Sequence, residues 1–113
     1  MKKQSLLSLQ RQYDRLRQNL ARIGYISQGS VLDRSTLKTP RTGYQWTRKL
    51  SRKTITVALS QQQFEALRQA IQNRKTLSQS IAQMERLSRQ ILFATAPDTR
   101  RRKRLSPKVL GLN

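Results

Sequence analysis

The sequence lacks cysteine and histidine altogether, and it contains only five carboxylates. Without cysteine the chain has no disulfide framework, thiolate metal site or thiol nucleophile, and without histidine it lacks the commonest general acid–base residue. A two-metal phosphoryl-transfer site needs several convergent carboxylates, whereas the acids here are scattered along the chain. They are Asp14, Asp33, Glu65, Glu85 and Asp98. We therefore expect no catalytic residue, no metal site and no cofactor, and the chain is predicted not to be an enzyme.

Long hydrophobic runs are also missing. No apolar stretch approaches the roughly 18 residues of a membrane-spanning helix. Leu6 and Leu7 follow a basic start, but Arg11 and Asp14 interrupt the segment before the apolar core of a signal peptide could form. We expect a cytoplasmic protein with no membrane span.

What the chain has in excess is positive charge. Its 113 residues include 24 Lys and Arg and carry a formal net charge of +19. Self-repulsion on this scale is most easily tolerated when a polyanion supplies the counter-charge, so nucleic acid, either DNA or RNA, is the leading partner. An acidic membrane surface is a weaker candidate, because neither expected helix couples a wide apolar face to flanking aromatic residues.

Two segments have the periodicity of helices. The first covers residues 6–23, where apolar residues recur at alternating spacings of three and four residues. Gly24 follows directly, and glycine commonly ends a helix. The second begins after Ser60, which forms a capping box with Gln63, and ends before Pro97. Its apolar stripe slips near Arg74-Lys75. At about 35 residues it would span roughly 50 Å, so its excess length would project or pair with a second copy.

The middle of the chain favours strands. Residues 53–59 alternate in the period-2 pattern of a half-buried strand, and residues 43–50 place Tyr44, Trp46 and Arg48 on one face. A turn near Ser51-Arg52 would join these two strands as a hairpin. Since Ser-Arg is not a favoured pair for the tightest turns, we expect a slightly longer turn. Residues 25–32 predict a third strand.

Together these elements predict an α+β fold. It has an N-terminal helix, a short antiparallel β-sheet of two or three strands, and a long C-terminal helix that packs on the first. We expect a single helix–sheet–helix domain over residues 1–96. Residues 97–113 contain a run of like charges and little apolar content, and they predict a disordered basic tail.

The segment 34–53 is the main candidate site, because it carries seven bases and no acid. Lys and Arg neutralise phosphates, and an exposed Tyr or Trp can stack on an unpaired base. The alternative is that Tyr44 and Trp46 fill the small core and leave only the charges outside, and for Trp46 the core is favoured. The candidate nucleic-acid-binding residues of this segment are Arg34, Lys38, Arg41, Tyr44, Trp46, Arg48, Lys49, Arg52 and Lys53.

A second basic candidate lies in the tail, at Arg100, Arg101, Arg102, Lys103 and Arg104. Such a run fits an arm that grips phosphates, an RNA-binding segment that orders on contact, or a nuclear localisation signal in a eukaryotic protein. A merely solubilising tail is the alternative. Because it offers no fixed scaffold, we expect it to add affinity rather than sequence specificity.

Several short motifs resemble an uncharacterised family of small bacterial proteins often associated with transposase genes. They are Gly29-Ser30, residues 43–49 (Gly-Tyr-Gln-Trp-Thr-Arg-Lys), residues 53–56 (Lys-Thr-Ile-Thr), residues 67–71 (Leu-Arg-Gln-Ala-Ile) and Asn73-Arg74. The resemblance covers roughly residues 6–92. Family members often carry clustered cysteines ahead of the aromatic strand, where this chain has residues 33–38 without cysteine. The resemblance therefore implies a mobile-element setting with DNA or RNA nearby, and it brings no metal site and no catalytic residue.

The expected function is that of a non-catalytic nucleic-acid-binding accessory protein, such as an auxiliary factor of a transposon or other mobile element. The alternative is a structural or scaffold subunit of a nucleoprotein assembly, which would bind a larger protein through its helical stripes. A homodimer would also bury those stripes.

Overall fold

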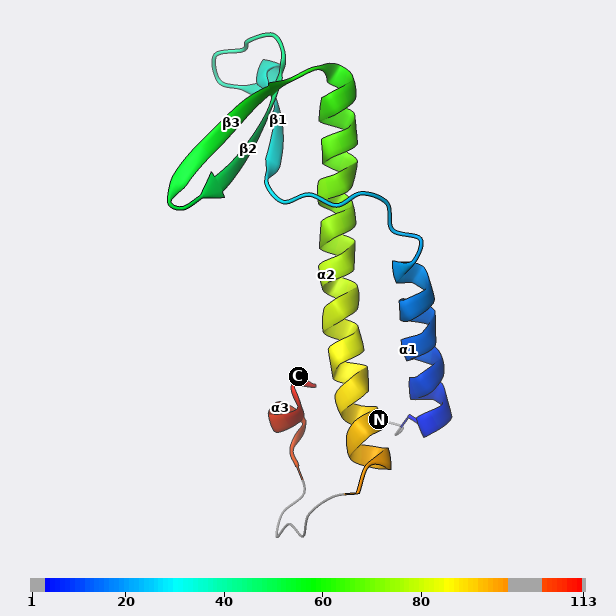
Figure 1. The fold of residues 1–113 in the computed structure, drawn as a ribbon. Coiled ribbons are helices and arrows are strands. Elements are labelled where there is room, and N and C mark those ends of the chain that lie inside the picture. Colours follow the sequence, from blue (N-terminus) through cyan, green and yellow to red (C-terminus); the bar gives the residue numbers. More distant parts are fainter. Residues whose placement is uncertain (1–3, 98–104, 113) are drawn as a thin grey trace. The chain divides into compact units, whose positions relative to one another are not determined.

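The structure is a computed structural model that describes residues 4–97 and 105–112, and it confirms the α+β class (Figure 1). The elements in order are α1 (Leu6–Leu20), β1 (Ser30–Asp33), the 3-10 turn η1 (Arg34–Thr36), β2 (Tyr44–Leu50), β3 (Lys53–Leu59), α2 (Gln61–Thr95) and α3 (Pro107–Leu110). The chain divides into two compact units, where the sequence predicted one domain. Ile23–Leu77 form what we call the sheet unit. The described residues before 23 and after 77 form the helical unit.

The boundary between the units falls inside α2, between Leu77 and Ser78. It lies close to Arg74-Lys75, where the apolar repeat of the sequence slips. A slip in the repeat rotates the apolar stripe around the helix, so the two halves of one helix present apolar residues to different neighbours. The continuous helix α2 thus contributes to both units.

The sheet unit holds a three-stranded antiparallel sheet in the order β1-β2-β3. Trp46 of β2 stands opposite Val31 of β1 and Val57 of β3. Directly opposed residues share a face of the sheet. One face therefore carries Tyr44, Trp46 and Arg48 from β2 with the apolar residues of β3, as the period-2 pattern predicted. The opposite face is mostly polar, although it also carries Leu32 opposite Gln45. A 3.1 Å hydrogen bond between the hydroxyls of Ser30 and Thr47 joins two strands on this face.

The hairpin turn is tighter than the sequence predicted. Leu50 and Lys53 are paired, so only Ser51 and Arg52 form the loop. Their φ angles are 49° and 69°, the left-handed pair that type I′ turns require. The expectation of a longer turn was wrong, because the pairing of seven residues on each strand fixes the loop length and makes two non-glycine residues adopt this conformation.

The end of the sheet that holds Tyr44 contacts the first turn of α2. The Tyr44 and Phe64 rings stack with centroids 4.5 Å apart. The capping box is confirmed: the Ser60 backbone N–H donates to Gln63 Oε1 at 2.9 Å, and the Gln63 N–H donates to Ser60 Oγ at 3.2 Å. The cap fixes where the helix leaves β3 and so sets Phe64 beneath the sheet.

The predicted strand at 25–32 is shorter than expected, since β1 begins only at Ser30. The preceding residues bond to α2 instead of to a strand. The Ser27 backbone N–H donates to the Ala70 carbonyl at 3.2 Å, and Asn73 Nδ2 donates to the Tyr25 carbonyl at 2.9 Å. A strand here was predicted from composition alone, whereas these partners come from a helix about 45 residues further along the chain.

The helical unit contains α1 and the C-terminal part of α2, which run antiparallel (Figure 1). Ser5 caps α1 by accepting from the Ser8 N–H at 3.1 Å. Leu9 of α1 and Leu87 of α2 are buried, which agrees with the predicted apolar stripes. A groove of about 360 Å³ between the helices is lined by polar and cationic side chains, including Arg15 and Arg86, and by Leu16 and Leu87.

The tail contains a short helix, α3, that was not predicted from the sequence. A disordered tail was predicted from residue 97. Residues 98–104 lie outside the described residues, but for Pro107–Leu110 the prediction was wrong. Ser106 caps the Val109 N–H, and Gly111 ends α3 at φ 72°. The signal was present in the sequence as Ser-Pro followed by Gly, which is a start-and-stop pattern for a short helix.

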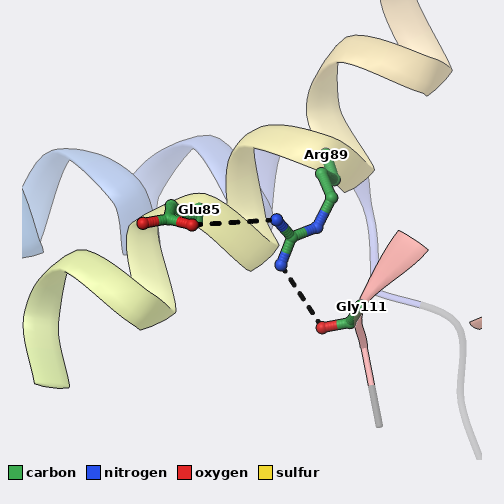
Figure 2. A network of polar contacts seen from close by, with 3 residues as sticks. All are labelled: Glu85, Arg89 and Gly111. Atoms are coloured by element: carbon green, nitrogen blue, oxygen red, sulfur yellow. Dashed lines mark hydrogen bonds and ion pairs between the residues drawn. The ribbon is translucent and has the colours of Figure 1, made fainter. Parts of the chain in front are cut away.

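One arginine joins α3 to α2 within the helical unit (Figure 2). Arg89 Nη2 donates to the Gly111 carbonyl at 3.3 Å, and Arg89 Nη1 lies 3.9 Å from Glu85 Oε2. The Glu85–Arg89 pair has the spacing of four residues at which opposite charges support a helix. The short helix is therefore tied to α2 by a charge-assisted bond in addition to its own caps.

Candidate nucleic-acid interface

The basic segment 34–53 does not form a single patch. By the strand register, Tyr44 pairs with both Asp33 and Leu59 at one end of the sheet, and Leu50 pairs with Lys53 at the other. The seven residues from Tyr44 to Leu50 span about 20 Å, six steps of 3.4 Å. We call Arg34, Lys38 and Arg41 the loop cations. We call Arg48, Lys49, Arg52 and Lys53 the hairpin cations. The sheet thus separates two positive groups that the sequence presented as one.

The loop cations lie in a connection that is closed by its own backbone. The Arg34 N–H donates to the Gly43 carbonyl at 3.0 Å, and the Arg41 N–H donates to the Arg34 carbonyl at 3.1 Å. Arg34 Nε also donates to Gln45 Oε1 at 3.3 Å, which directs this side chain along the polar face of the sheet. Lys38 and Arg41 are exposed. The loop is therefore an ordered support for cations.

Asp33 is the one acid close to the loop cations in sequence, and it is engaged within the loop. Its Oδ1 accepts from the Ser35 hydroxyl at 2.7 Å and from the Ser35 N–H at 3.0 Å. These two hydrogen bonds, the hydroxyl first, hold the pKa of Asp33 below its ordinary value, against a small opposing effect of desolvation. The carboxylate stays ionised and serves as the cap of η1.

The hairpin cations surround the tip of β2 and β3. Lys49, Arg52 and Lys53 are exposed, and Arg48 is half-buried. Because side chains alternate along a strand, Arg48 lies on the face that carries Trp46 and Lys49 lies on the opposite face. A polyanion can therefore meet positive charge from either side of the tip.

Neither aromatic residue of β2 is freely exposed, and both are half-buried. Tyr44 stacks on Phe64. Trp46 Nε1 donates to the Gln28 carbonyl at 3.0 Å, while the Arg48 guanidinium lies over its ring, 5.7 Å from the centroid. Both rings are therefore packed against neighbouring groups, although neither is fully buried. Trp46 also borders a groove of about 520 Å³, which Ile26, Ser27, Gln28, Arg48 and Arg74 complete.

Two residues near this groove were not among the predicted site residues. Tyr25 is 92% exposed, although its carbonyl is bonded to Asn73, and Arg74 lines the groove from α2. Tyr25 was missed because a strand assignment predicts a half-buried ring. Arg74 was missed because its place on α2 lies 26 residues away from Arg48 in the sequence.

The other charged candidates have simpler placements. Asp14 pairs with Arg17 at 3.0 Å, and Glu85 pairs with Arg89, so both acids have a salt-bridge partner on their own helix. Within residues 4–97 and 105–112, no three acidic side chains gather in a way that could hold a metal ion. The run Arg100, Arg101, Arg102, Lys103 and Arg104 lies outside the described residues.

Across the part of the chain that the structure describes, no helix has the length and apolar character needed to cross a membrane. Comparison of the chain with family models, with curated proteins and with solved structures finds no match.

Proposed function

We propose that this chain is a non-catalytic nucleic-acid-binding accessory protein of the cytoplasm. The observation that carries the proposal is the pair of cation groups, the loop cations and the hairpin cations, on the two ends of one small sheet. Asp33, the acid beside the loop cations, is already bonded to Ser35. Among the described residues, Asp33 forms no ion pair with the loop cations, so their charge stays available for phosphates.

The spacing of the two groups supports a backbone contact rather than the binding of a small anion. A separation of about 20 Å exceeds the size of a single phosphate group. A phosphodiester chain that crosses the sheet would meet both groups at once. Phosphate contacts of this kind position a protein on nucleic acid without reading its sequence.

Two parts of the proposal rest on the sequence alone. The basic run 100–104 would act as an arm that adds phosphate contacts. The mobile-element setting, and with it the role of an auxiliary factor in transposition, rests on the family resemblance of residues 6–92. The groups at the two ends of the sheet do not depend on either part.

The test is the salt dependence of binding to a labelled oligonucleotide, measured by fluorescence anisotropy with single- and double-stranded probes. Each neutralised phosphate adds about 0.9 to the slope of log affinity against log salt for duplex DNA and about 0.7 for single strands. The double variants Lys38→Gln/Arg41→Gln and Lys49→Gln/Arg52→Gln should each lower the slope by between one and two.

A matched control is Arg11→Gln/Arg22→Gln, which removes the same charge from exposed positions outside the sheet unit. This variant should change the slope far less than either sheet variant. A flat salt response of the wild type, or absence of binding to both DNA and RNA at low ionic strength, would overturn the proposal.

A second candidate function is a scaffold subunit that binds a larger protein. The observation in its favour is the small number of buried side chains, because among the described residues only Leu9, Ala70 and Leu87 form the core. In the helical unit, Leu7, Ile81 and Leu92 remain 57%, 44% and 58% exposed. Exposed apolar stripes of this kind fit a protein partner or a second copy.

The two candidates can be separated by polar substitutions in the helical stripes. Ile81→Asp should abolish binding to a larger protein and leave the affinity for oligonucleotides within about twofold, whereas the sheet variants should do the reverse. Sedimentation of the purified wild type and of Ile81→Asp would report whether a second copy covers the stripe. Equal behaviour of wild type and Ile81→Asp in both assays would exclude the scaffold function.

A further inference from the structure

Tyr25 combines an exposed ring with an anchored backbone. Its side chain is 92% exposed. Its carbonyl oxygen accepts from Asn73 Nδ2 at 2.9 Å, and two residues later the Ser27 N–H donates to the Ala70 carbonyl at 3.2 Å. An aromatic ring this exposed forgoes the burial that ordinarily stabilises it. The two backbone bonds nevertheless hold the segment that contains Tyr25 against α2.

Tyr25 adjoins, along the chain, the groove bordered by Trp46, although it does not itself line it. The next residue, Ile26, lines this groove, and the partner of the Tyr25 carbonyl, Asn73, precedes the groove residue Arg74. The backbone of Tyr25 is therefore held by residues next to the groove on two segments, the one before β1 and α2. None of the residues that line it is acidic.

The groove holds two guanidinium groups, from Arg48 and Arg74. Arg48 lies over the Trp46 ring, 5.7 Å from its centroid, and the indole N–H is fixed on the Gln28 carbonyl at 3.0 Å. A guanidinium that rests on an aromatic face loses less freedom when it binds a phosphate, because its orientation is already restricted.

We propose that this surface takes an unpaired stretch of nucleic acid, with a base stacked on Tyr25 and the adjoining phosphates held by Arg48 and Arg74. This inference rests on the proposed function and names the form of nucleic acid that the sheet unit prefers. Duplex DNA hides the faces of its bases, so only a single strand, a loop or an end can stack on an exposed ring. The cations would then supply affinity, and Tyr25 the preference for unpaired bases.

This inference is tested by comparing the affinity for a single-stranded oligonucleotide with that for a blunt duplex of the same sequence, as DNA and as RNA. Wild type should bind the single strand more tightly. Tyr25→Ala should lose about tenfold in affinity for the single strand and less than twofold for the duplex. The slope of its salt dependence should not change, because no phosphate contact is removed. Tyr25→Phe, which keeps the ring, should bind like the wild type.

Substitution of a groove arginine should instead change the slope of the salt dependence. Arg74→Gln should lower the slope for the single strand by about 0.7. Lys75→Gln is the matched control, because it removes the same charge from the next residue of α2, which is also exposed and does not line the groove. It should leave the slope close to that of the wild type.

Trp46 supplies a direct readout, since it is the single tryptophan of the chain and it borders the groove. Its fluorescence should change on addition of a single strand and should change less on addition of duplex. Equal affinities for the two forms, or Tyr25→Ala binding like the wild type, would overturn this inference and leave the proposed function intact. Absence of binding to every probe at low salt would overturn both.

Discussion

At the scale of single residues, Gly29 controls the position of the Trp46 indole. Gly29 has φ 102°, and a Cβ built on it would lie 2.5 Å from Trp46 Nε1 and 2.5 Å from the Thr47 carbonyl oxygen. Gly29→Ala should therefore incur both the left-handed strain, about 1–2 kcal/mol, and a steric displacement of the indole. We expect a lower urea midpoint and an altered Trp46 fluorescence spectrum.

Gly43→Ala is the control that separates these two effects. Gly43 has a similar φ of 99°, but the nearest atom to its added Cβ is Arg34 Nη1 at 3.5 Å, an ordinary contact. This variant should cost only the backbone strain and leave the Trp46 spectrum unchanged. Equal losses of stability in the two variants would mean that the indole does not depend on Gly29.

A second residue-scale prediction concerns the pH dependence at Asp33. The Ser35 bonds lower the pKa of this carboxyl in the folded chain. Its contribution to stability is therefore present above the unfolded pKa, near 4, and is lost as the pH falls through the folded value. Ser35→Ala removes the hydroxyl bond and should move the pKa upward, as measured by NMR titration of the carboxyl carbon.

The backbone bond from residue 35 survives in Ser35→Ala, so the pKa should stay below that of an unstructured Asp. In Asp33→Asn, the free energy of unfolding should fall less on acidification, because this carboxyl group no longer contributes to the loss. An Asp33 pKa that does not move in Ser35→Ala would contradict the role given to the Ser35 hydroxyl.

At the scale of elements, the turn between β2 and β3 has a strained backbone and carries positive charge. Ser51 and Arg52 both have positive φ, at a cost of roughly 1–2 kcal/mol for a left-handed residue. Strain of this kind persists where the surrounding structure fixes it and it often marks a functional segment. Here it places Arg52 at the tip between the hairpin cations.

The turn gives a prediction in which stability and binding change in opposite directions. Ser51→Asn/Arg52→Gly installs the pair that type I′ turns favour and should raise the free energy of unfolding by about 1 kcal/mol. It should also weaken oligonucleotide binding, because one cation is lost. Denaturant unfolding and anisotropy measure the two effects. The single variant Ser51→Asn keeps the charge, so weaker binding in that variant would argue against a role for the Arg52 charge.

At the scale of the whole molecule, the net charge of +19 opposes compaction. Added salt screens repulsion between exposed charges that lie further apart than about 10 Å at 0.1 M. We therefore expect the Tm to rise between 0.05 and 0.5 M NaCl, as measured by circular dichroism. A polyanion such as a short oligonucleotide should raise it further at low salt, because binding to the folded chain adds stability. A Tm that falls with salt would mean that attractive ion pairs dominate the surface.

The sequence by itself determined the features that depend on near neighbours along the chain. These features are the capping box of Ser60 and Gln63, the alternation through β3 and the ends of α2. Each arises within a few residues, so local sequence patterns predicted them. The net charge and the absence of histidine and cysteine are likewise properties of composition, and they limit the class of partner without reference to a fold.

Only the tertiary structure decided which of these residues lie together. The strand register separates Arg41 from Arg52, which one basic segment had joined, and the bonds to Ala70 and Asn73 hold Tyr25 and Ser27 on α2. Contacts between residues so far apart in sequence depend on how elements pack, and no local pattern encodes them. For this reason the exposure of the Tyr25 ring and the bond from Asn73 to its carbonyl became visible only in the folded chain.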